Sequence, residues 1–293
     1  MSASLLLAQF VSGLTTAMFL FLIASGLSLV FGVMRVLNFA HGSFYMIGAY
    51  LAWQVVAWVH PVGGAFWLAV LGAGVGVALL GLVVERFLLR FLYGWEELYQ
   101  LLLTYALVLI LGDVAKFIWG TGQLSVDRPP VLNGGLEVLG TTVPYYNLFI
   151  MILGPVIAII GWLVLARSSA GRMMRAAAYD REMLDALGAN VGALYTGMFV
   201  VASFLAGIAG GLVTPIESVV PGMDVQIIVQ AFIVVVIGGM GSFWGTFWGS
   251  VIYGQVLAFG ILIFPGFAIF SVFALMAVVL VIRPWGMFGR PIR

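Results

Sequence analysis

The sequence has no cysteine and little charge, and each shortage excludes a class of protein. Without cysteine in 293 residues there can be no disulfide, no thiolate metal ligand and no thiol nucleophile. Histidine occurs twice, and charged residues make up 8% of the chain, against about 25% in soluble domains. No carboxylate pair shares a plausible site, and there is no phosphate-binding loop of the Walker type. The sequence therefore offers no site at which this chain could itself hydrolyse ATP.

Apolar sequence is abundant instead, with hydrophobic residues making up 63% of the chain. Several runs reach or approach the roughly 20 apolar residues that cross a bilayer as a helix. The alternation typical of membrane barrel strands is missing, so we expect an all-α, polytopic helical bundle in the membrane. No basic residue precedes the first run, so we expect a retained span and no cleaved signal. About eight or nine spans are predicted, at residues 5–31, 39–59, 66–89, 98–118, 146–166, 191–213, 227–237, 249–264 and 267–282.

Two stretches are expected to interrupt membrane helices. Residues 32–42 place Arg, Asn, His and two Gly within an apolar run, and residues 238–249 contain five Gly. Transporters commonly carry such breaks, because unwound backbone near the midplane can line a substrate path. Both stretches contain Gly-Ser-Phe, at 42–44 and 241–243, which leaves an internal repeat open.

Glycine also clusters inside two of the predicted spans, at residues 72–76 and 207–211. Small residues allow the backbones of membrane helices to approach closely. We therefore interpret these glycines as packing positions, with a gating hinge as the alternative.

The uneven distribution of lysine and arginine predicts the orientation, since these residues accumulate on the cytoplasmic side. A cytoplasmic loop at 167–190 places ten of the 12 basic residues inside and leaves Lys116 and Arg128 outside. The ten are Arg35, Arg86, Arg90, Arg167, Arg172, Arg175, Arg181, Arg283, Arg290 and Arg293. We therefore predict that the N-terminus is outside and the C-terminus inside.

The loop at 167–190 is unusual because it carries seven of the chain's charged residues, of which there are 12 basic and 11 acidic in total. Drawn as one helix, it has an apolar side interrupted by Asp180 and a charged opposite side. Gly188 and Asn190 are expected to end this helix. A solvated connector whose charges serve topology is one interpretation. Topology requires only basic residues, however, so three acids and a short apolar stripe favour a surface for a partner protein.

Three segments resemble motifs of one family. Residues 171–191, GRMMRAAAYDREMLDALGANV, resemble the cytoplasmic coupling segment of the branched-chain amino acid ABC transporter permeases. Residues 26–50, GLSLVFGVMRVLNFAHGSFYMIGAY, resemble the N-terminal signature of that family, and residues 238–245, GGMGSFWG, its C-terminal glycine motif. The three matches occur in the same order as in the family. Together with the length of the chain, they extend the resemblance over nearly the whole sequence. Together they resemble the shorter, LivH-type permease.

The resemblance implies a permease subunit of an ATP-driven importer in the bacterial inner (cytoplasmic) membrane, with residues 1–293 as a single transmembrane domain. The implied partners are a LivM-type permease, two cytoplasmic ATPase subunits of LivG/LivF type, which bind the ATP, and a periplasmic substrate-binding protein. No nucleic acid and no cofactor of its own are expected, and lipid surrounds the chain. The resemblance implies ATPase-coupling roles for Arg172, Arg175, Asp180, Arg181, Glu182, Asp185 and Gly188.

The best candidates for a translocation pathway lie at the two helix breaks. Asn38 and His41 can hydrogen-bond a polar solute there, although they could equally satisfy freed backbone groups or lie at the membrane surface. The full set of pathway candidates is Asn38, His41, Gly42, Ser43, Gly239, Gly241 and Ser242. Glu217 and Asp224, in a predicted external loop, are candidate contacts for the binding protein, with solvated loop acids as the alternative.

Other classes of protein remain as alternatives. An intramembrane enzyme would need a catalytic set that two histidines and no cysteine do not supply. An ion-coupled carrier usually keeps charges inside its spans, and none lies clearly at a span centre here. The substrate is expected to be leucine, isoleucine or valine from the resemblance, and urea, short amides and aromatic acids remain open.

Overall fold

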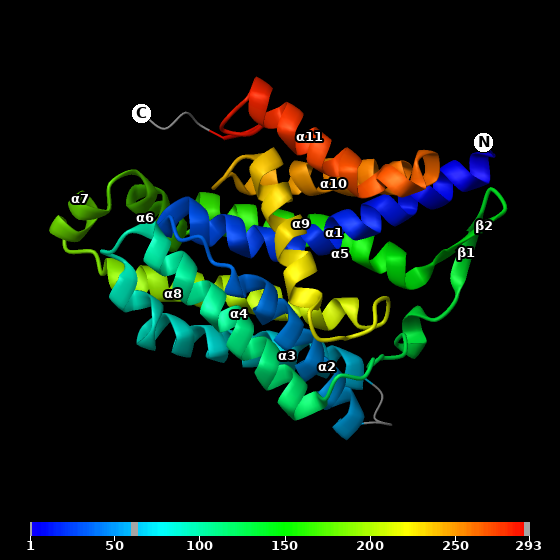
Figure 1. The fold of residues 1–293 in the computed structure, drawn as a ribbon, viewed down its shortest axis with the longest axis horizontal. Coiled ribbons are helices and arrows are strands. Elements are labelled where there is room, and N and C mark those ends of the chain that lie inside the picture. The colour runs from blue at the N-terminus through cyan, green and yellow to red at the C-terminus, as the bar shows by residue number, and fades with distance from the viewer. Residues whose placement is uncertain (1, 60–63, 290–293) are drawn as a thin grey trace. The chain divides into compact units, whose positions relative to one another are not determined.

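The computed structural model describes residues 2–59 and 64–289, and helices dominate these ranges (Figure 1). Each predicted span corresponds to one apolar helix in the structure. The long helices are α1 (Ala3–Met34), α2 (Ala40–Val59), α3 (Ala65–Phe87), α4 (Glu97–Trp119), α5 (Tyr145–Arg167), α8 (Val191–Val213), α9 (Met223–Gly238), α10 (Phe243–Ile263) and α11 (Ala268–Ile282). Shorter elements are η1 (Leu89–Leu92), η2 (Pro130–Leu132), η3 (Pro265–Phe267), α6 (Ser169–Tyr179) and α7 (Arg181–Ala186).

Seven helices of the described ranges are long and apolar enough to cross a membrane. The two long helices outside this group are α2, whose 20 residues include His41, Ser43 and Gln54, and α9, which has 16 residues. The chain is thus a polytopic helical membrane protein. Arg290 and Arg293, which entered the orientation argument, lie outside the described residues.

The predicted helical fold class is confirmed, and one small hairpin stands beside the helices of the described residues. Strands β1 (Gly135–Val138) and β2 (Thr141–Pro144) pair antiparallel, with Val138 opposite Thr141. The two connecting residues, Leu139 and Gly140, have φ of 52° and 76°. Positive φ at both central residues is what a two-residue turn matching strand twist requires. The hairpin follows a polar, proline-containing segment between α4 and α5.

Both predicted interruptions are present, and both are shorter than the predicted ranges 32–42 and 238–249. The first spans residues 35–39, between α1 and α2. The second is confined to residues 239–242, so α10 begins at Phe243 and not at Gly249. Gly249 is helical because it packs on α9: a Cβ there would lie 2.7 Å from the Val234 carbonyl oxygen. These glycines therefore serve helix contact as well as the break.

The chain divides into two compact units, which are described separately. The first comprises residues 1–25, 128–162 and 230–293, and the second comprises residues 26–127 and 163–229. Helices α1, α5 and α9 each contribute residues to both units. The expectation of one transmembrane domain over the whole chain stays a prediction.

Helices α2, α3 and α8 form the centre of the second unit, and glycine sets their spacing. A Cβ on Gly207 would lie 2.7 Å from the Ala73 carbonyl oxygen and 2.8 Å from the Val77 Cβ. Gly74 faces Ile208 and Gly81 faces Ser203, so α3 and α8 run antiparallel. The packing interpretation of the two glycine clusters is confirmed for these positions.

In the first unit, the start of α1 packs against α10 and α5. A Cβ on Gly254 would lie 2.2 Å from the Gly13 carbonyl oxygen. The Phe21 ring meets the rings of Phe243 and Phe247 edge-on, with centroids 5.7 and 5.2 Å apart. Small residues on α10 thus allow backbone contact, and the aromatic rings fill the space beside it.

We expect Gly207→Ala to destabilise the protein by about 1–3 kcal/mol, as overpacking of a close-packed interior does. The matched control is Gly197→Ala in the same helix, where an added Cβ meets nothing within 4 Å. Unfolding of the purified protein in mixed micelles measures both variants. Equal stability of the two variants would contradict the close-packing role of Gly207.

Candidate functional site

The charged segment between α5 and α8 forms two short helices, α6 and α7, and not the single helix expected (Figure 1). Asp180 separates them, with φ of −151° and ψ of 101°. Its carboxylate accepts a hydrogen bond from the Met183 N–H at 2.9 Å. An aspartate in extended conformation that bonds the third residue onward is a strong helix N-cap. Asp180 thus ends α6 and begins α7, which is why the apolar stripe is interrupted there.

The other ends of these helices are also formed by local hydrogen bonds. The Ser168 hydroxyl accepts from the Gly171 N–H at 2.9 Å and caps α6. Gly188, at φ 83°, donates its N–H to the Asp185 carbonyl, and Ala189 donates to the Leu184 carbonyl. These two hydrogen bonds form a Schellman motif, and the motif favours glycine at position 188 because this position requires a positive φ. Asn190, expected to help end the segment, instead caps α8.

Three arginines expected to face the ATPase are bonded to their own chain. The Arg172 guanidinium donates to the Arg167 carbonyl at 3.2 Å, and Arg175 donates to the Leu165 carbonyl. Both carbonyls lie in the last turn of α5, where four carbonyls lack helical partners and the helix dipole favours cations. Arg181 of α7 donates to the Tyr93 carbonyl at 3.4 Å. These bonds connect the segment to the end of α5 and to Tyr93, while all three arginine side chains remain exposed.

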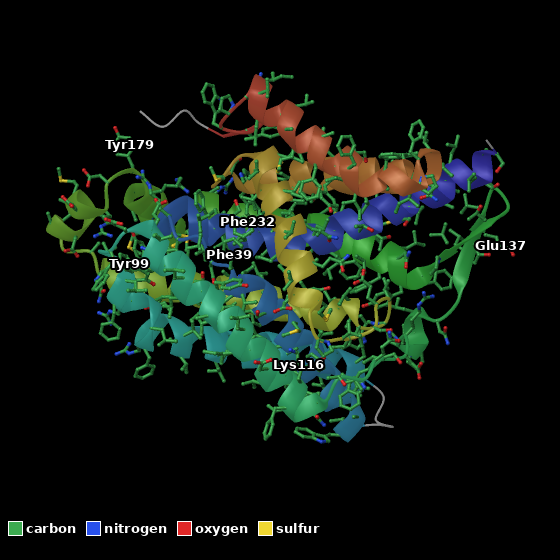
Figure 2. The ribbon with its side chains drawn as sticks, in the orientation of Figure 1. Phe39, Tyr99, Lys116, Glu137, Tyr179 and Phe232 are labelled. Carbon is green, nitrogen blue, oxygen red and sulfur yellow. The ribbon has the colours of Figure 1, made fainter. Side chains whose placement is uncertain are left out.

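The acids and several apolar side chains of the segment are exposed. Glu182 and Asp185 lie on the surface of α7. Tyr179 is 93% exposed and projects outward from α6 (Figure 2), and Leu187 is 77% exposed. Exposed apolar side chains among charges, on a polar segment too short to span a bilayer, mark a surface suited to a protein partner.

A cavity of about 410 Å³ lies beside the segment in the second unit. Its lining comes from the end of α1, the start of α4, the two short helices and α8. Charges of both signs surround it, including Arg35, Arg181 and Glu97. Gln100 is buried at its edge and donates to the Leu92 carbonyl at 3.0 Å.

The pathway candidates of the first break are buried in the second unit. Asn38 is 1% exposed, and neither its Oδ1 nor its Nδ2 has a hydrogen-bond partner within the described residues. Buried amides without partners are uncommon and costly. His41, Gly42 and Ser43 follow in the first turn of α2, all buried. The first break therefore places a buried side-chain amide, that of Asn38, where it has no hydrogen-bond partner among the described residues.

The two acids expected to contact a binding protein differ in exposure. Glu217 is exposed, whereas Asp224 is 3% exposed and accepts a hydrogen bond from the Ser43 hydroxyl at 2.8 Å. A Cβ on Gly42 would lie 2.5 Å from the Asp224 carbonyl oxygen, so α2 and the start of α9 touch. The structure thus brings Asp224 together with a pathway candidate and leaves Glu217 on the surface.

The remaining pathway candidates belong to the first unit. Gly239 and Gly241 have φ of 102° and 80°, and they turn the chain between α9 and α10. The Ser242 hydroxyl accepts from the Gly245 N–H at 3.1 Å and caps α10. The backbone near Gly289 folds against Gly239, where an added Cβ would lie 2.4 Å from the Gly289 nitrogen.

A buried acid near the end of α3 was missed in the sequence. Glu85 has 0% exposure and accepts hydrogen bonds from the Tyr93 hydroxyl at 2.8 Å and the Thr196 hydroxyl at 2.7 Å. Burial raises the pKa of Tyr93, and the bond to Glu85 raises it further, so Tyr93 stays a donor. Glu85 was not singled out from the sequence. The signal that could have found it is its place four residues inside the predicted span 66–89, where an acid is unusual.

Within the described residues, seven membrane-length helices define the class as a multi-pass membrane protein, and a polar two-helix segment connects two of these helices. The family model described as "Branched-chain amino acid transport system / permease component" matches residues 9–282. The chain therefore belongs to this family of permease components. It is a transport component of the inner (cytoplasmic) membrane, as the motif resemblance predicted.

Curated relatives match along nearly their full length. The permease protein BraD of the high-affinity branched-chain amino acid transport system of Pseudomonas aeruginosa is 30% identical, over 97% of this chain and 96% of its own. LivH of Salmonella typhimurium and LivH of Escherichia coli K12 are each 29% identical with the same coverage. A solved structure, PsaBC from Streptococcus pneumoniae in complex with Fab, covers 92% of this chain and 89% of its own at 11% identity and a TM-score of 0.45. That likeness is too low to assign the fold.

Proposed function

We propose that this chain is the permease subunit that moves leucine, isoleucine and valine into the cell through an ATP-binding cassette importer. The full-length match to relatives named as permeases of high-affinity branched-chain amino acid transport systems carries this proposal. A separate binding protein delivers the solute, and separate ATPase subunits supply the energy, because the chain has no Walker-type loop of its own. The permease moves solute and is not itself an enzyme.

The proposed assembly contains a LivM-type permease, two ATPases of LivG/LivF type and a periplasmic binding protein. The names of the relatives and the family description support such partners. Residues 1–293 form one transmembrane permease domain in this proposal, with the N-terminus outside and the C-terminus inside. The ten-to-two distribution of basic residues supports the orientation.

We place the contact with the ATPase on α6 and α7. Glu182 and Asp185 are its charged contacts, since both carboxylates are exposed. The other coupling candidates shape and anchor the segment through the bonds described above: Arg172, Arg175, Asp180, Arg181 and Gly188. Closure of the ATPase pair would then displace α7, and with it α8, which follows α7 in the chain, and Tyr93, whose carbonyl accepts from Arg181.

The proposed pathway uses polar groups at both helix breaks. Asn38, His41, Gly42 and Ser43 come from the first break, and Gly239, Gly241 and Ser242 come from the second. The unpartnered amide of Asn38 supports the first group. Glu217 is the proposed contact for the binding protein, supported by its exposure. We assign Asp224 to the pathway beside Ser43 because its carboxylate is buried.

Uptake by the complete importer in proteoliposomes tests this function. With ATP inside and the binding protein outside, we expect uptake of radiolabelled leucine that vanadate stops and that requires the binding protein. Uptake of urea, a short amide or an aromatic acid in place of leucine would contradict the substrate but not the importer class. Solute movement by this chain alone, without nucleotide or partners, would overturn both.

Charge reversal on α7 tests the docking surface. We expect the double variant Glu182→Arg, Asp185→Arg to insert normally and to lose about tenfold or more of its solute-stimulated ATP hydrolysis, as loss of interfacial charge pairs does. Glu137→Arg, at an exposed acid of β1, is the control and should behave as wild type. Wild-type stimulation in the α7 variant argues against docking there.

The absence of cysteine makes the orientation directly measurable, since a single introduced thiol has no background. We expect a membrane-impermeant maleimide to label Glu137→Cys in right-side-out vesicles and Tyr179→Cys only in inverted vesicles. Both side chains are exposed, so access depends on the side of the membrane. The reverse labelling pattern would refute the predicted orientation.

A further inference from the structure

Glu85 combines complete burial with hydrogen bonds to two separate elements. Its Oε1 accepts from Tyr93, which follows η1, and its Oε2 accepts from Thr196 on α8. Among the described residues the structure records no ion pair for this carboxylate. A buried carboxylate without a cation is unfavourable unless hydrogen bonds replace its water. The two hydroxyls provide that replacement, so the acid is held by neutral donors from both sides.

The Thr196 bond lies at one end of the contact between α3 and α8. Along that contact Gly74 meets Ile208, Gly81 meets Ser203, and Glu85 then meets Thr196. Glycine contacts fix the spacing of the two helices but provide no directional bond. Glu85 supplies a charge-assisted hydrogen bond between them, of a kind stronger than neutral ones.

The second hydrogen bond, from Tyr93, connects Glu85 to a residue that also contacts α7. The Tyr93 ring packs edge-on against Tyr195 with centroids 5.5 Å apart, and its carbonyl accepts from Arg181. Tyr93 therefore contacts α7 through its backbone, α8 through its ring and α3 through its hydroxyl. A displacement of α7 can therefore reach α3 through Tyr93, in addition to its direct contact with α8.

We propose that Glu85 is a positioning residue that transmits motion of α7 to the α3–α8 pair by holding Tyr93 and Thr196 together. This inference rests on the proposed function, because it assumes that α7 moves with the ATPase. Without the carboxylate, Tyr93 loses its side-chain bond to α3 and Thr196 loses its bond across the α3–α8 contact, so displacement of α7 is transmitted less effectively to this helix pair. ATP hydrolysis then continues while transport falls.

Substitutions at Glu85 separate hydrogen bonding from charge. In Glu85→Gln the amide oxygen accepts from Tyr93, and the amide N–H donates to the Thr196 oxygen. The Thr196 hydroxyl is then free to donate to the Gly192 carbonyl, which lies 3.0 Å away. Glu85→Ala removes every bond. We therefore expect leucine transported per ATP hydrolysed to fall about tenfold in Glu85→Ala, as loss of a hydrogen bond to a charged group predicts, and to stay near wild type in Glu85→Gln.

Two partner variants keep the test valid if Glu85→Ala fails to fold. Tyr93→Phe and Thr196→Val each delete one donor while preserving shape, and each should lower the same ratio, whereas Thr196→Ser retains the hydroxyl and should match wild type. A structural role alone would reduce the amount of folded importer but leave this ratio unchanged. A wild-type ratio in Glu85→Ala, or in both partner variants, would overturn the proposal. So would equal impairment in Glu85→Gln and Glu85→Ala.

Hydrogen exchange on the purified importer distinguishes this inference from the proposed substrate. We expect amides of residues 89–95 and 181–186 to exchange about tenfold faster in Glu85→Ala than in wild type or Glu85→Gln, following the same lost bond. If wild type takes up no leucine, the proposed substrate fails, and the exchange comparison still decides the role of Glu85. Unchanged exchange in Glu85→Ala would refute the connection.

Discussion

The lack of water in the hydrocarbon core of the membrane is the constraint on which this structure depends. Every backbone N–H and carbonyl there needs a partner within the protein, and helices supply those partners within one segment. The hydrophobic effect does not drive helices to associate in lipid, so their association depends on closely fitting surfaces. Glycine at Gly207 and Gly74 allows α3 and α8 to approach until backbone meets side chain. The same constraint limits non-helical backbone to short stretches such as residues 35–39 and 239–242.

Buried acidic side chains also need hydrogen-bond partners within the protein. Glu85 and Asp224 are nearly inaccessible, and their recorded hydrogen bonds come from hydroxyls. Each acid connects segments that are distant in sequence, so each is a point where one helix can influence another. Asp224 joins the first turn of α9 to α2 beside the first helix break. Glu85 joins α3 to α8 and to the connection that contacts α7.

The segment formed by α6 and α7 shows how one short sequence divides its charges between two tasks. Arg172 and Arg175 bond the last carbonyls of α5, where the helix dipole favours positive charge. Asp180 is used as a cap, and Gly188 supplies the positive φ that closes α7. The exposed surface of the segment carries Glu182 and Asp185, apolar side chains such as Leu187, and the arginines, which remain exposed while bonded to the chain. A partner would therefore meet charges of both signs among apolar side chains.

Hydropathy and local motifs were enough to predict the membrane class, the apolar helices, the two breaks and the family, because both are properties of neighbouring residues. They also located the charged segment and its closing glycine. Three features were decided only by tertiary structure: the burial of Asp224, the pairing of Glu85 with Thr196, and the engagement of Arg175 with α5. Each of these contacts depends on which distant segment of the chain lies opposite. An acid at the end of an apolar run has the same sequence pattern whether its carboxylate faces lipid headgroups or accepts a hydrogen bond from a hydroxyl.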